Sequence, residues 1–262
     1  MDKHLPDKCL GRGVLIVNAD DWGRDRTTTD RTHDCIRHRA VSSVSAMVFM
    51  EDSERAAVTA REHKIDAGLH LNFTTPFSAP GTRTPLIEHQ HQLTQFLRLH
   101  RFAQVIFHPG LTRSFDYVVK AQLDEFRRIY GSEPARIDGH HHMHLCSNVV
   151  LKKLMPFGAI VRRNFSFQPG EKGLLNRLYR KYVDSILKQR YKLVDFMFTL
   201  PPLEPEDRLR RIFSLAQRFA VEVEAHPVNP EEYQFLIGGE ILHRAGDLPI
   251  ASYFSVGKPY FS

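Results

Sequence analysis

Long apolar runs are absent from this chain of 262 residues. No stretch approaches the roughly 20 consecutive apolar residues that a membrane-spanning helix needs. Residues 1–13 are polar and charged, without the apolar centre of a secretory signal. We therefore expect a cytoplasmic protein with no transmembrane segment.

Cysteine is also scarce, and its spacing excludes two classes of site. The three cysteines, Cys9, Cys35 and Cys146, lie far apart and form no CxxC pair. This pattern predicts neither a disulfide framework nor a thiolate zinc site. Cys146 lies close to a histidine cluster, but free cysteines usually behave as small buried residues. We expect the same of Cys146.

Blocks of like charge are missing, although the net charge is +6 and the pI is near 9.3. Nucleic-acid binding predicts a continuous basic stripe, whereas Lys and Arg are dispersed here, so we expect no nucleic-acid partner. The densest basic stretch, 172–192, has the apolar spacing of an amphipathic helix. We expect this helix to turn its apolar side chains towards the core: Leu174, Leu175, Leu178, Tyr182, Val183, Ile186 and Leu187. A helix on a membrane or nucleic-acid surface is the alternative.

Short apolar segments alternate with helical ones, which predicts an α/β fold with a mainly parallel sheet. A barrel of alternating strands and helices takes about 250 residues and would use nearly the whole chain. Strands are expected at 14–18, 42–49, 67–72, 136–138, 159–163, 221–225 and 250–255. Helices are expected at 28–39, 53–63 (with Ser53 as N-cap), 90–101, 114–130, 172–192 and 206–219. Residues 73–85, rich in Pro, Thr and Ser, predict a loop at the rim of a site.

Asp20 and Asp21 directly follow the apolar residues 14–17. Two carboxylates this close repel each other and raise each other's pKa. A metal ion is the usual way to offset that repulsion. The pair therefore predicts a metal site in which one Asp binds the ion and the other handles a proton.

His70 lies in the strand expected at 67–72. In an extended strand, Gly68, His70 and Asn72 share one face. A single strand histidine is usually satisfied by a hydrogen bond in the core. The carboxylate pair and the histidine cluster elsewhere in the chain favour a metal ligand instead.

Residues 138–144 are the strongest anomaly of composition, with Asp138 followed by four histidines in five positions. If the segment is extended, His140, His142 and His144 share a face; if it is helical, His140 and His144 do. They cannot all bind one ion. We favour a metal site here over a group of surface histidines.

His226 precedes Pro227, which favours an extended backbone at the end of a strand. A proton donor and a hydrogen-bonded strand end are equally good interpretations of this histidine. All four segments fall at the carboxyl ends of expected strands, where α/β proteins build their sites. One Asp with two His leaves open positions on an ion and is compatible with Zn, Mn, Co, Ni, Fe(II) or Mg.

These motifs, at 18–23, 68–72, 138–144 and 226–227, resemble those of the YdjC-like (ChbG/HpnK) carbohydrate deacetylases. The resemblance runs from Val14 to the C-terminus. It implies a (β/α) barrel-like fold of the glycoside hydrolase/deacetylase superfamily, with a single domain at 14–262 after an N-terminal extension at 1–13. It also implies hydrolysis of N-acetyl groups on amino sugars of the chitooligosaccharide kind, with a divalent ion that is usually Mg²⁺.

Carried over residue by residue, the resemblance implies Asp21, His70 and His140 as metal ligands and Asp20 as general base. By analogy it assigns the general acid to His226, with His142 as the competitor. Three residues would bind substrate or support the ligands: Asn72, Asp138, which would orient a ligating histidine, and His142. The chain departs from the family pattern at Gly139, where Ser is usual, and at Trp22, where Phe is common. Neither change removes a ligand.

Two other functions are alternatives to a deacetylase. A different metal hydrolase, such as a phosphoesterase, would need further Asp or His ligands for a second ion, and no clear ones stand out. A non-catalytic carbohydrate- or metal-binding protein on the same fold would have no use for Asp20. The sequence leaves the sugar, its length or lipid linkage, the physiological metal and homodimer formation open.

Overall fold

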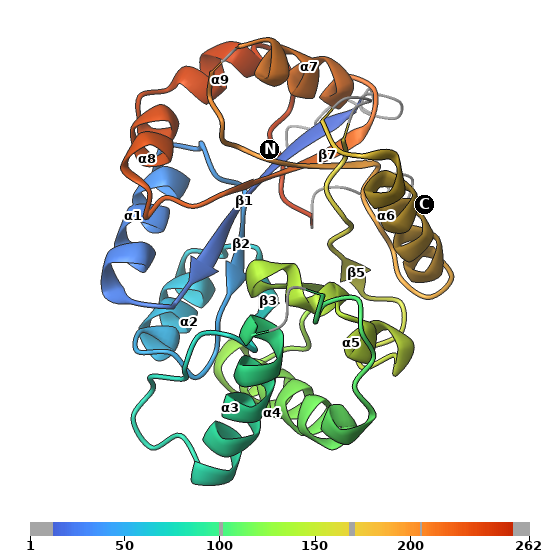
Figure 1. Cartoon of the computed structure of the whole chain (residues 1–262). Helices are drawn as coiled ribbons and strands as arrows, with labels where there is room; N and C mark the ends of the chain where they lie inside the picture. The colour runs from blue at the N-terminus through green and yellow to red at the C-terminus, as the bar shows by residue number, and fades with distance from the viewer. Residues whose placement is uncertain (1–12, 100–101, 168–170, 205, 254–262) are drawn as a thin grey trace.

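Seven parallel strands form the centre of the molecule in this computed structural model (Figure 1). The structure describes residues 13–99, 102–167, 171–204 and 206–253. In space the strands run in the order β5-β4-β3-β2-β1-β7-β6. They are β1 (Val14–Trp22), β2 (Ser43–Ala46), β3 (Ala67–Leu71), β4 (Arg136–Gly139), β5 (Ile160–Val161), β6 (Phe196–Thr199) and β7 (Ala220–Ala225).

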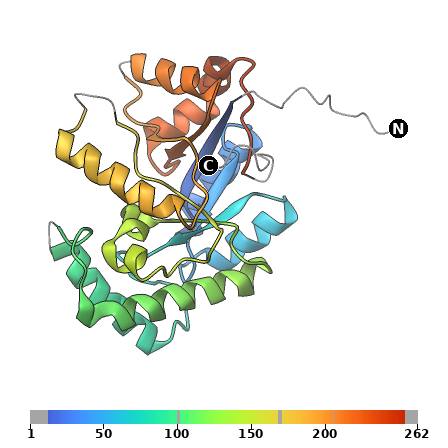
Figure 2. The same ribbon diagram turned by 90° about the vertical axis from the view of Figure 1, so that its right-hand side faces the viewer.

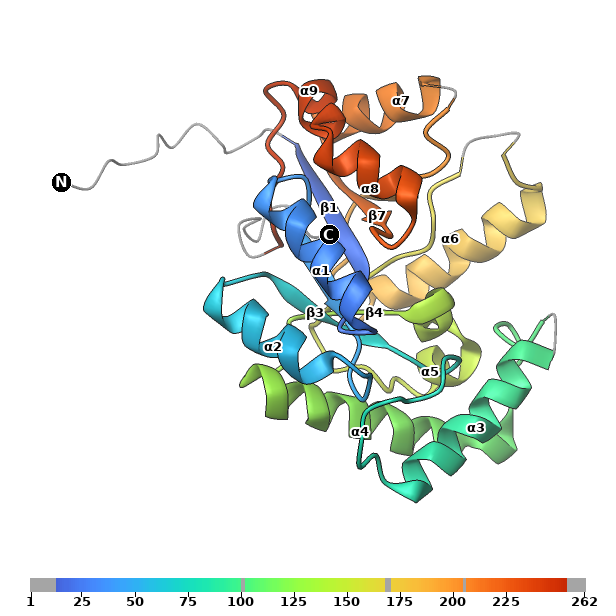
Figure 3. The same cartoon turned by 90° about the vertical axis from the view of Figure 1, so that its left-hand side faces the viewer.

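Helices surround this sheet on the outside, as Figures 1, 2 and 3 show together. They are α1 (Arg26–Arg37), α2 (Ser53–Glu62), α3 (Thr84–Leu99), α4 (Thr112–Tyr130), α5 (Ser147–Leu151), α6 (Leu174–Lys188), α7 (Asp207–Ala216), α8 (Pro230–Ile237) and α9 (Glu240–Ala245). The described residues also form two 3-10 helices, η1 (Pro109–Leu111) and η2 (His140–Leu145). None of the described helices has the length and apolar character needed to cross a bilayer.

The two edge strands approach each other, so the sheet curls towards a barrel. Lys192, just before β6, donates its N–H to the carbonyl of Ala159 at 3.0 Å and accepts from Val161 of β5 at 2.9 Å. Beyond β5, the Ser166 N–H donates to the carbonyl of Met197 in β6 at 2.8 Å. These bonds link the ends of the strand order and give a barrel-like enclosure.

The two faces of β1 separate two hydrophobic clusters. Leu15, Val17 and Ala19 face outward and pack in the main core under the helices. Val14 and Ile16 face the inside, where they form a small second cluster. Alternation along a strand produces this division. The inside of the barrel is therefore apolar at the N-terminal ends of the strands and polar towards their C-terminal ends.

Most predicted elements are present, with shifted ends. β1 runs on to Trp22, so the aspartate pair lies within the strand rather than after it. β6 was not predicted. At the expected strand 250–255, the described part shows only an isolated bridge between Ile250 and Leu15, and residues 254–255 lie outside the described residues. So do residues 1–12, which include Cys9.

The expected N-cap of α2 was wrong by one residue. Asp52 occupies the cap position. The Ser53 hydroxyl instead accepts from the Met50 N–H and donates to the Met47 carbonyl, both at 2.9 Å. The burial expected of Cys146 is confirmed, since its side chain is almost fully enclosed.

The expected orientation of the basic helix, now α6, was wrong in part. Val183 and Leu187 are buried as expected. Four other apolar residues that we expected to face the core are exposed: Leu174, Leu175, Leu178 and Tyr182. A polar anchor accounts for the orientation, because buried Asp184 accepts hydrogen bonds from Arg163 at 2.8 Å and from the Asn164 side chain at 2.9 Å.

Gly68 is a position where packing between β3 and β4 requires glycine. A Cβ there would lie 2.8 Å from Arg136 Cζ and 2.9 Å from the Arg136 carbonyl oxygen. We predict that Gly68→Ala lowers the free energy of unfolding by about 1–3 kcal/mol, as overpacking of a tight interior does, measured by urea denaturation. The control is Gly173→Ala, where a Cβ would meet nothing within 4 Å. Equal stability losses in the two variants would contradict the prediction.

Candidate metal centre

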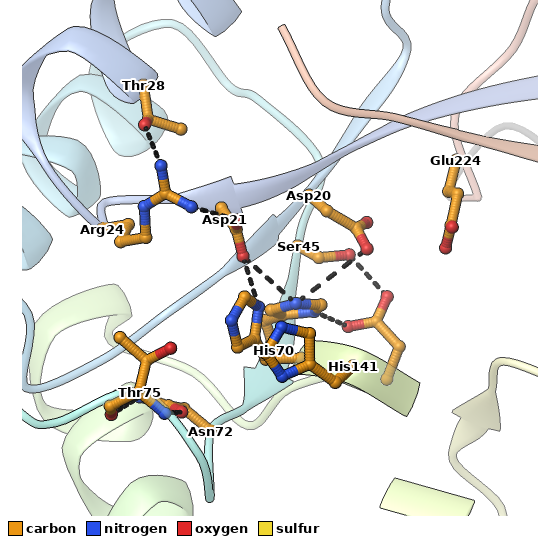
Figure 4. A network of polar contacts seen from close by, with 12 residues as sticks. Asp20, Asp21, Arg24, Thr28, Ser45, His70, Asn72, Thr75, His141 and Glu224 are labelled. Atoms are coloured by element: carbon orange, nitrogen blue, oxygen red, sulfur yellow. Dashed lines mark hydrogen bonds and ion pairs between the residues drawn. The ribbon is translucent and has the colours of Figure 1, made fainter. Parts of the chain in front are cut away.

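A bulge in β1 turns two neighbouring carboxylates to the same side. Ala19 pairs with Val44 and Trp22 pairs with Ala46, so β1 has one residue more than β2 over this stretch. Asp21 within the bulge has a φ of 64°, a left-handed conformation that Asp adopts more readily than most residues. In a regular strand the two side chains would point to opposite faces. Here both point towards His70 (Figure 4).

One oxygen of Asp21 is the meeting point of three buried side chains. Asp21 Oδ1 lies 2.9 Å from His140 Nδ1 and 3.5 Å from His70 Nε2. One ligand atom from each residue falls within 4.8 Å of the others, as a shared metal ion requires. The structure thus brings together the three ligands that the resemblance implied.

The same oxygen provides a test of whether a cation fits. Asp21 Oδ2 accepts from Arg24 at 2.7 Å, whereas Oδ1 is buried without a hydrogen-bond partner. His140 Nδ1 lies 2.9 Å from this oxygen and His70 Nε2 lies 3.5 Å from it. An unpartnered carboxylate oxygen is costly to bury. A cation between Asp21 and the two imidazoles would satisfy it.

Asp138 orients His70 towards this point. Its Oδ1 lies 2.8 Å from His70 Nδ1, which leaves Nε2 facing Asp21. Carboxylates hold metal-binding histidines in this way, and Asp138 was the residue expected to do so. Burial alone would lower the pKa of the His70 imidazole, but the charges of Asp20 and Asp138 outweigh it and raise this pKa to about 10.

Arg162 binds Asp20 and was missed in the sequence. Its two terminal nitrogens donate to the two oxygens of Asp20 at 2.6 and 2.7 Å. It also contacts Asp138 at 3.1 Å, Glu222 at 2.7 Å and Glu224 at 3.2 Å. Burial would raise the pKa of Asp20, but the charges of Arg162 and His70 and the Arg162 hydrogen bonds together outweigh burial and lower this pKa. The available signal was a pair of arginines, Arg162 and Arg163, at the end of the strand expected at 159–163.

The second group of suitable residues, Asp20, His70 and Asp138, is less available to an ion. Both Asp20 oxygens are bound by Arg162. Both Asp138 oxygens are engaged as well, one by His70 at 2.8 Å and the other by the Ser45 hydroxyl at 2.5 Å. The Asp21 group is therefore the better candidate.

The histidine cluster takes neither of the two expected conformations. His141 and His142 have φ values of 54° and 56°, so the segment is neither an extended strand nor a regular helix. Each histidine consequently has a different neighbour. His140 faces Asp21, His141 Nδ1 lies 2.9 Å from Thr74 Oγ1, His142 Nε2 lies 3.3 Å from Glu224 Oε2, and His144 Nε2 lies 2.9 Å from the Arg162 carbonyl.

His226 follows β7 at the level of Asp20, because Ala225 pairs with Ala19 on the neighbouring strand. It is half-buried, and its backbone N–H donates to Glu232 at 2.7 Å. Among the described residues, its imidazole makes no hydrogen bond or ion pair with Asp20 or Asp21. Its role as an acid stays a prediction.

Asn72 shapes the loop after β3 rather than facing an open site. The residue is fully buried. Its side-chain oxygen accepts from the N–H groups of Thr74 and Thr75, and its amide nitrogen donates to the Thr75 carbonyl at 2.7 Å. These bonds use the amide within the loop, so the structure gives Asn72 no contact with the Asp21 group.

A family profile described as YdjC-like protein matches residues 14–240. The chain belongs to the YdjC-like family. Among curated relatives of this YdjC-like chain, the chitooligosaccharide deacetylase of Enterobacter sp. (strain 638) is 30% identical over 132 residues, 50% of each chain. That of Proteus mirabilis (strain HI4320) is 31% identical over 136 residues, 52% of each chain. The chain spans about half the length of the curated relatives it matches.

A solved structure supports the fold assignment. It comes from Enterococcus faecalis V583 and is named for a suggested role in cellobiose-phosphate cleavage. It is 16% identical, covers 93% of this chain and 98% of its own, and has a TM-score of 0.62. The expected (β/α) barrel-like fold is confirmed, and at this identity the likeness concerns the fold alone.

Buried His144 makes stability of this YdjC-like protein depend on pH. Burial lowers the pKa of its imidazole to about 3, against the opposing hydrogen bond to the Arg162 carbonyl. Below about pH 6.5 the unfolded chain takes up a proton that the folded chain refuses, so this contribution to stability is lost as pH falls towards 3. We predict that His144→Gln makes the decline shallower by about 1 kcal/mol per pH unit. Urea denaturation at several pH values, with chelator present, measures it.

The control for that prediction is His243→Gln, which removes an exposed imidazole from α9. It should keep the slope of the parent protein. A His144→Gln variant whose stability declines with acid as steeply as that of the parent would show that His144 is not the group responsible.

Proposed function

We propose that this protein is a divalent-metal-dependent deacetylase that hydrolyses N-acetyl groups on amino sugars, with chitooligosaccharide-like substrates. The observation that carries the proposal is the unpartnered Asp21 oxygen between two imidazoles, beside a second aspartate that is separately ion-paired. The names of the curated relatives support the reaction and the substrate class.

Asp21, His70 and His140 would hold the metal ion. When bound, such an ion polarises a carbonyl oxygen and lowers the pKa of a water molecule. The family resemblance favours Mg²⁺, whereas two imidazoles with one carboxylate also suit Zn, Mn, Co or Ni. The expected metal, cytoplasmic location, homodimer and single domain at 14–262 stay predictions.

Asp20 is proposed as the general base. Its Oδ2 lies 3.9 Å from His70 Nε2, next to the ligand set, and Arg162 holds it in the ionised form. Asp20 would take a proton from water as the water oxygen attacks the acetyl carbonyl carbon. A base with a lowered pKa works through its fixed position rather than its intrinsic strength.

The amine leaves only if it receives a proton as the carbon–nitrogen bond breaks. We assign that proton to His226, and acetate and the free amino sugar are the products. His142 is the second candidate because its Nε2 lies 3.3 Å from the Glu224 carboxylate at the same end of the barrel. The two assignments differ in which substitution stops turnover.

A two-metal phosphoesterase is less well supported. The part of the chain that the structure describes offers one further ligand group, Asp20 with His70 and Asp138. That group shares His70 with the first, and Arg162 neutralises Asp20. A second ion would have to displace this guanidinium.

The ligand assignment predicts metal contents that differ between variants. His70→Ala and His140→Ala should lose bound metal because each removes one of three ligands. His226→Ala and His142→Ala, the controls, should keep it. Elemental analysis of purified protein and titration calorimetry of chelated protein with Mg²⁺, Mn²⁺ or Zn²⁺ measure this. Retained metal in His140→Ala would move that ligand to another histidine of the cluster.

The proton-transfer assignment predicts loss of turnover without loss of metal. Asp20→Asn and His226→Ala should each lower the rate of acetate release from N-acetylchitooligosaccharides by about 10² to 10⁴. Asp124→Asn, at an exposed site on α4, is the matched control and should keep its activity. The deacetylase proposal fails if no N-acetyl sugar of any length yields acetate with any of the divalent metals.

A further inference from the structure

Helix α6 carries a stripe of exposed apolar side chains. Leu174, Leu175, Leu178 and Tyr182 are 63%, 83%, 51% and 64% exposed. Their spacing places them along one side of the helix. The opposite side, with Val183 and Leu187, is the one that packs on the protein. Such a stripe is normally buried, so its exposure calls for something that covers it.

The exposed stripe on α6 is the first of two apolar prominences on the surface, and the second lies at the end of α3 and just after it. Leu99, Phe102, Val105 and Ile106 are 76%, 60%, 46% and 50% exposed. Figures 2 and 3, taken from opposite sides, both show the first turn of α6 and the last turn of α3 projecting on the same side of the molecule. We call these two sets of four residues the apolar rim.

The rim is anchored to the segments that carry the candidate centre. Gln104 donates to the His142 carbonyl at 3.0 Å, which ties the second prominence to the histidine cluster. Asp184 of α6 accepts from Arg163, the neighbour of Arg162, at 2.8 Å. Both parts of the rim therefore belong to segments that are hydrogen-bonded to chain neighbours of the candidate centre.

Charge indicates the kind of partner. Residues 89–115 and 172–183 contain no Asp or Glu, and the carboxylates that border them are Glu88, Asp116, Glu171 and Asp184. The same stretches supply Arg98 and Arg113 near the second prominence, and Lys172, Arg177 and Lys181 on or beside α6. Apolar side chains interleaved with cations, without carboxylates, are what an anionic lipid surface attracts. In a symmetric dimer, two copies of the rim would set these cations against each other.

We propose that the apolar rim docks on an anionic membrane surface, with its apolar side chains in the headgroup region and its Lys and Arg side chains against lipid phosphates. This is binding at the surface, without insertion across the bilayer. It is independent of the deacetylase proposal, because it concerns where the protein sits and can be measured without a substrate or a metal.

The test is sedimentation of the full chain with vesicles of phosphatidylcholine, alone or mixed with phosphatidylglycerol. Binding is expected only to the mixed vesicles and should weaken as salt is added. The double variant Leu175→Gln/Leu178→Gln should bind about tenfold more weakly, because it removes apolar burial while keeping helix propensity. Removing one charge with Lys181→Gln should weaken binding about fivefold.

The matched control is Val58→Gln/Leu242→Gln, which changes two exposed apolar residues outside the rim, at 41% and 38% exposure. It should bind like the parent protein. Failure to bind mixed vesicles, equal binding to neutral ones, or unchanged binding of the Leu175→Gln/Leu178→Gln variant would each overturn the proposal. So would sedimentation equilibrium that shows a dimer which this variant converts to a monomer, because the rim would then cover a second copy.

Discussion

The buried guanidinium of Arg162 is the charge on which the inside of the barrel depends. Barrels of this type usually fill their interior with branched apolar side chains. Here the apolar filling is limited to the small cluster at the N-terminal ends of the strands. Further along the barrel, Arg162 is surrounded by four carboxylates: Asp20, Asp138, Glu222 and Glu224. Removing one partner of such a network leaves uncompensated buried charge, which is typically destabilising by about 3–5 kcal/mol.

One cation cannot balance these four carboxylates. Burial raises the pKa of Glu222, so this carboxyl loses its charge more readily than an exposed one. Arg136 contributes a second positive charge, because its Nη1 lies 3.3 Å from Asp138 Oδ2. The raised pKa of His70 places a further positive charge beside Asp20 and Asp21 at the carboxyl ends of the strands. A divalent cation bound there would take the place of the His70 proton in this balance, so the interior network and the candidate centre are two parts of one electrostatic arrangement.

The sequence predicted the parts of this arrangement that depend on local pattern. The alternation of apolar and helical segments predicted most of the strands. Because Asp20, His70 and His140 fall at the carboxyl ends of those strands, the sequence also predicted that they lie close together. What it could not predict depends on contacts between distant segments. The bulge at Asp21 arises from a mismatch between β1 and β2, and the left-handed turns at His141 and His142 follow no periodicity. The outward face of α6 is set by a polar anchor at Asp184, which outweighs the apolar pattern.

The two arginines beside the aspartate pair give a physical reason for different roles. In the sequence Asp20 and Asp21 are equivalent, and only the family resemblance separated base from ligand. Arg162 occupies both oxygens of Asp20, whereas Arg24 occupies a single oxygen of Asp21. The other Asp21 oxygen faces the imidazoles of His70 and His140 and has no hydrogen-bond partner. A carboxylate held at both oxygens is charged and fixed, which suits proton transfer; a carboxylate with one bare oxygen suits a metal. Geometry thus favours the same division that the resemblance implied, and does so on independent grounds.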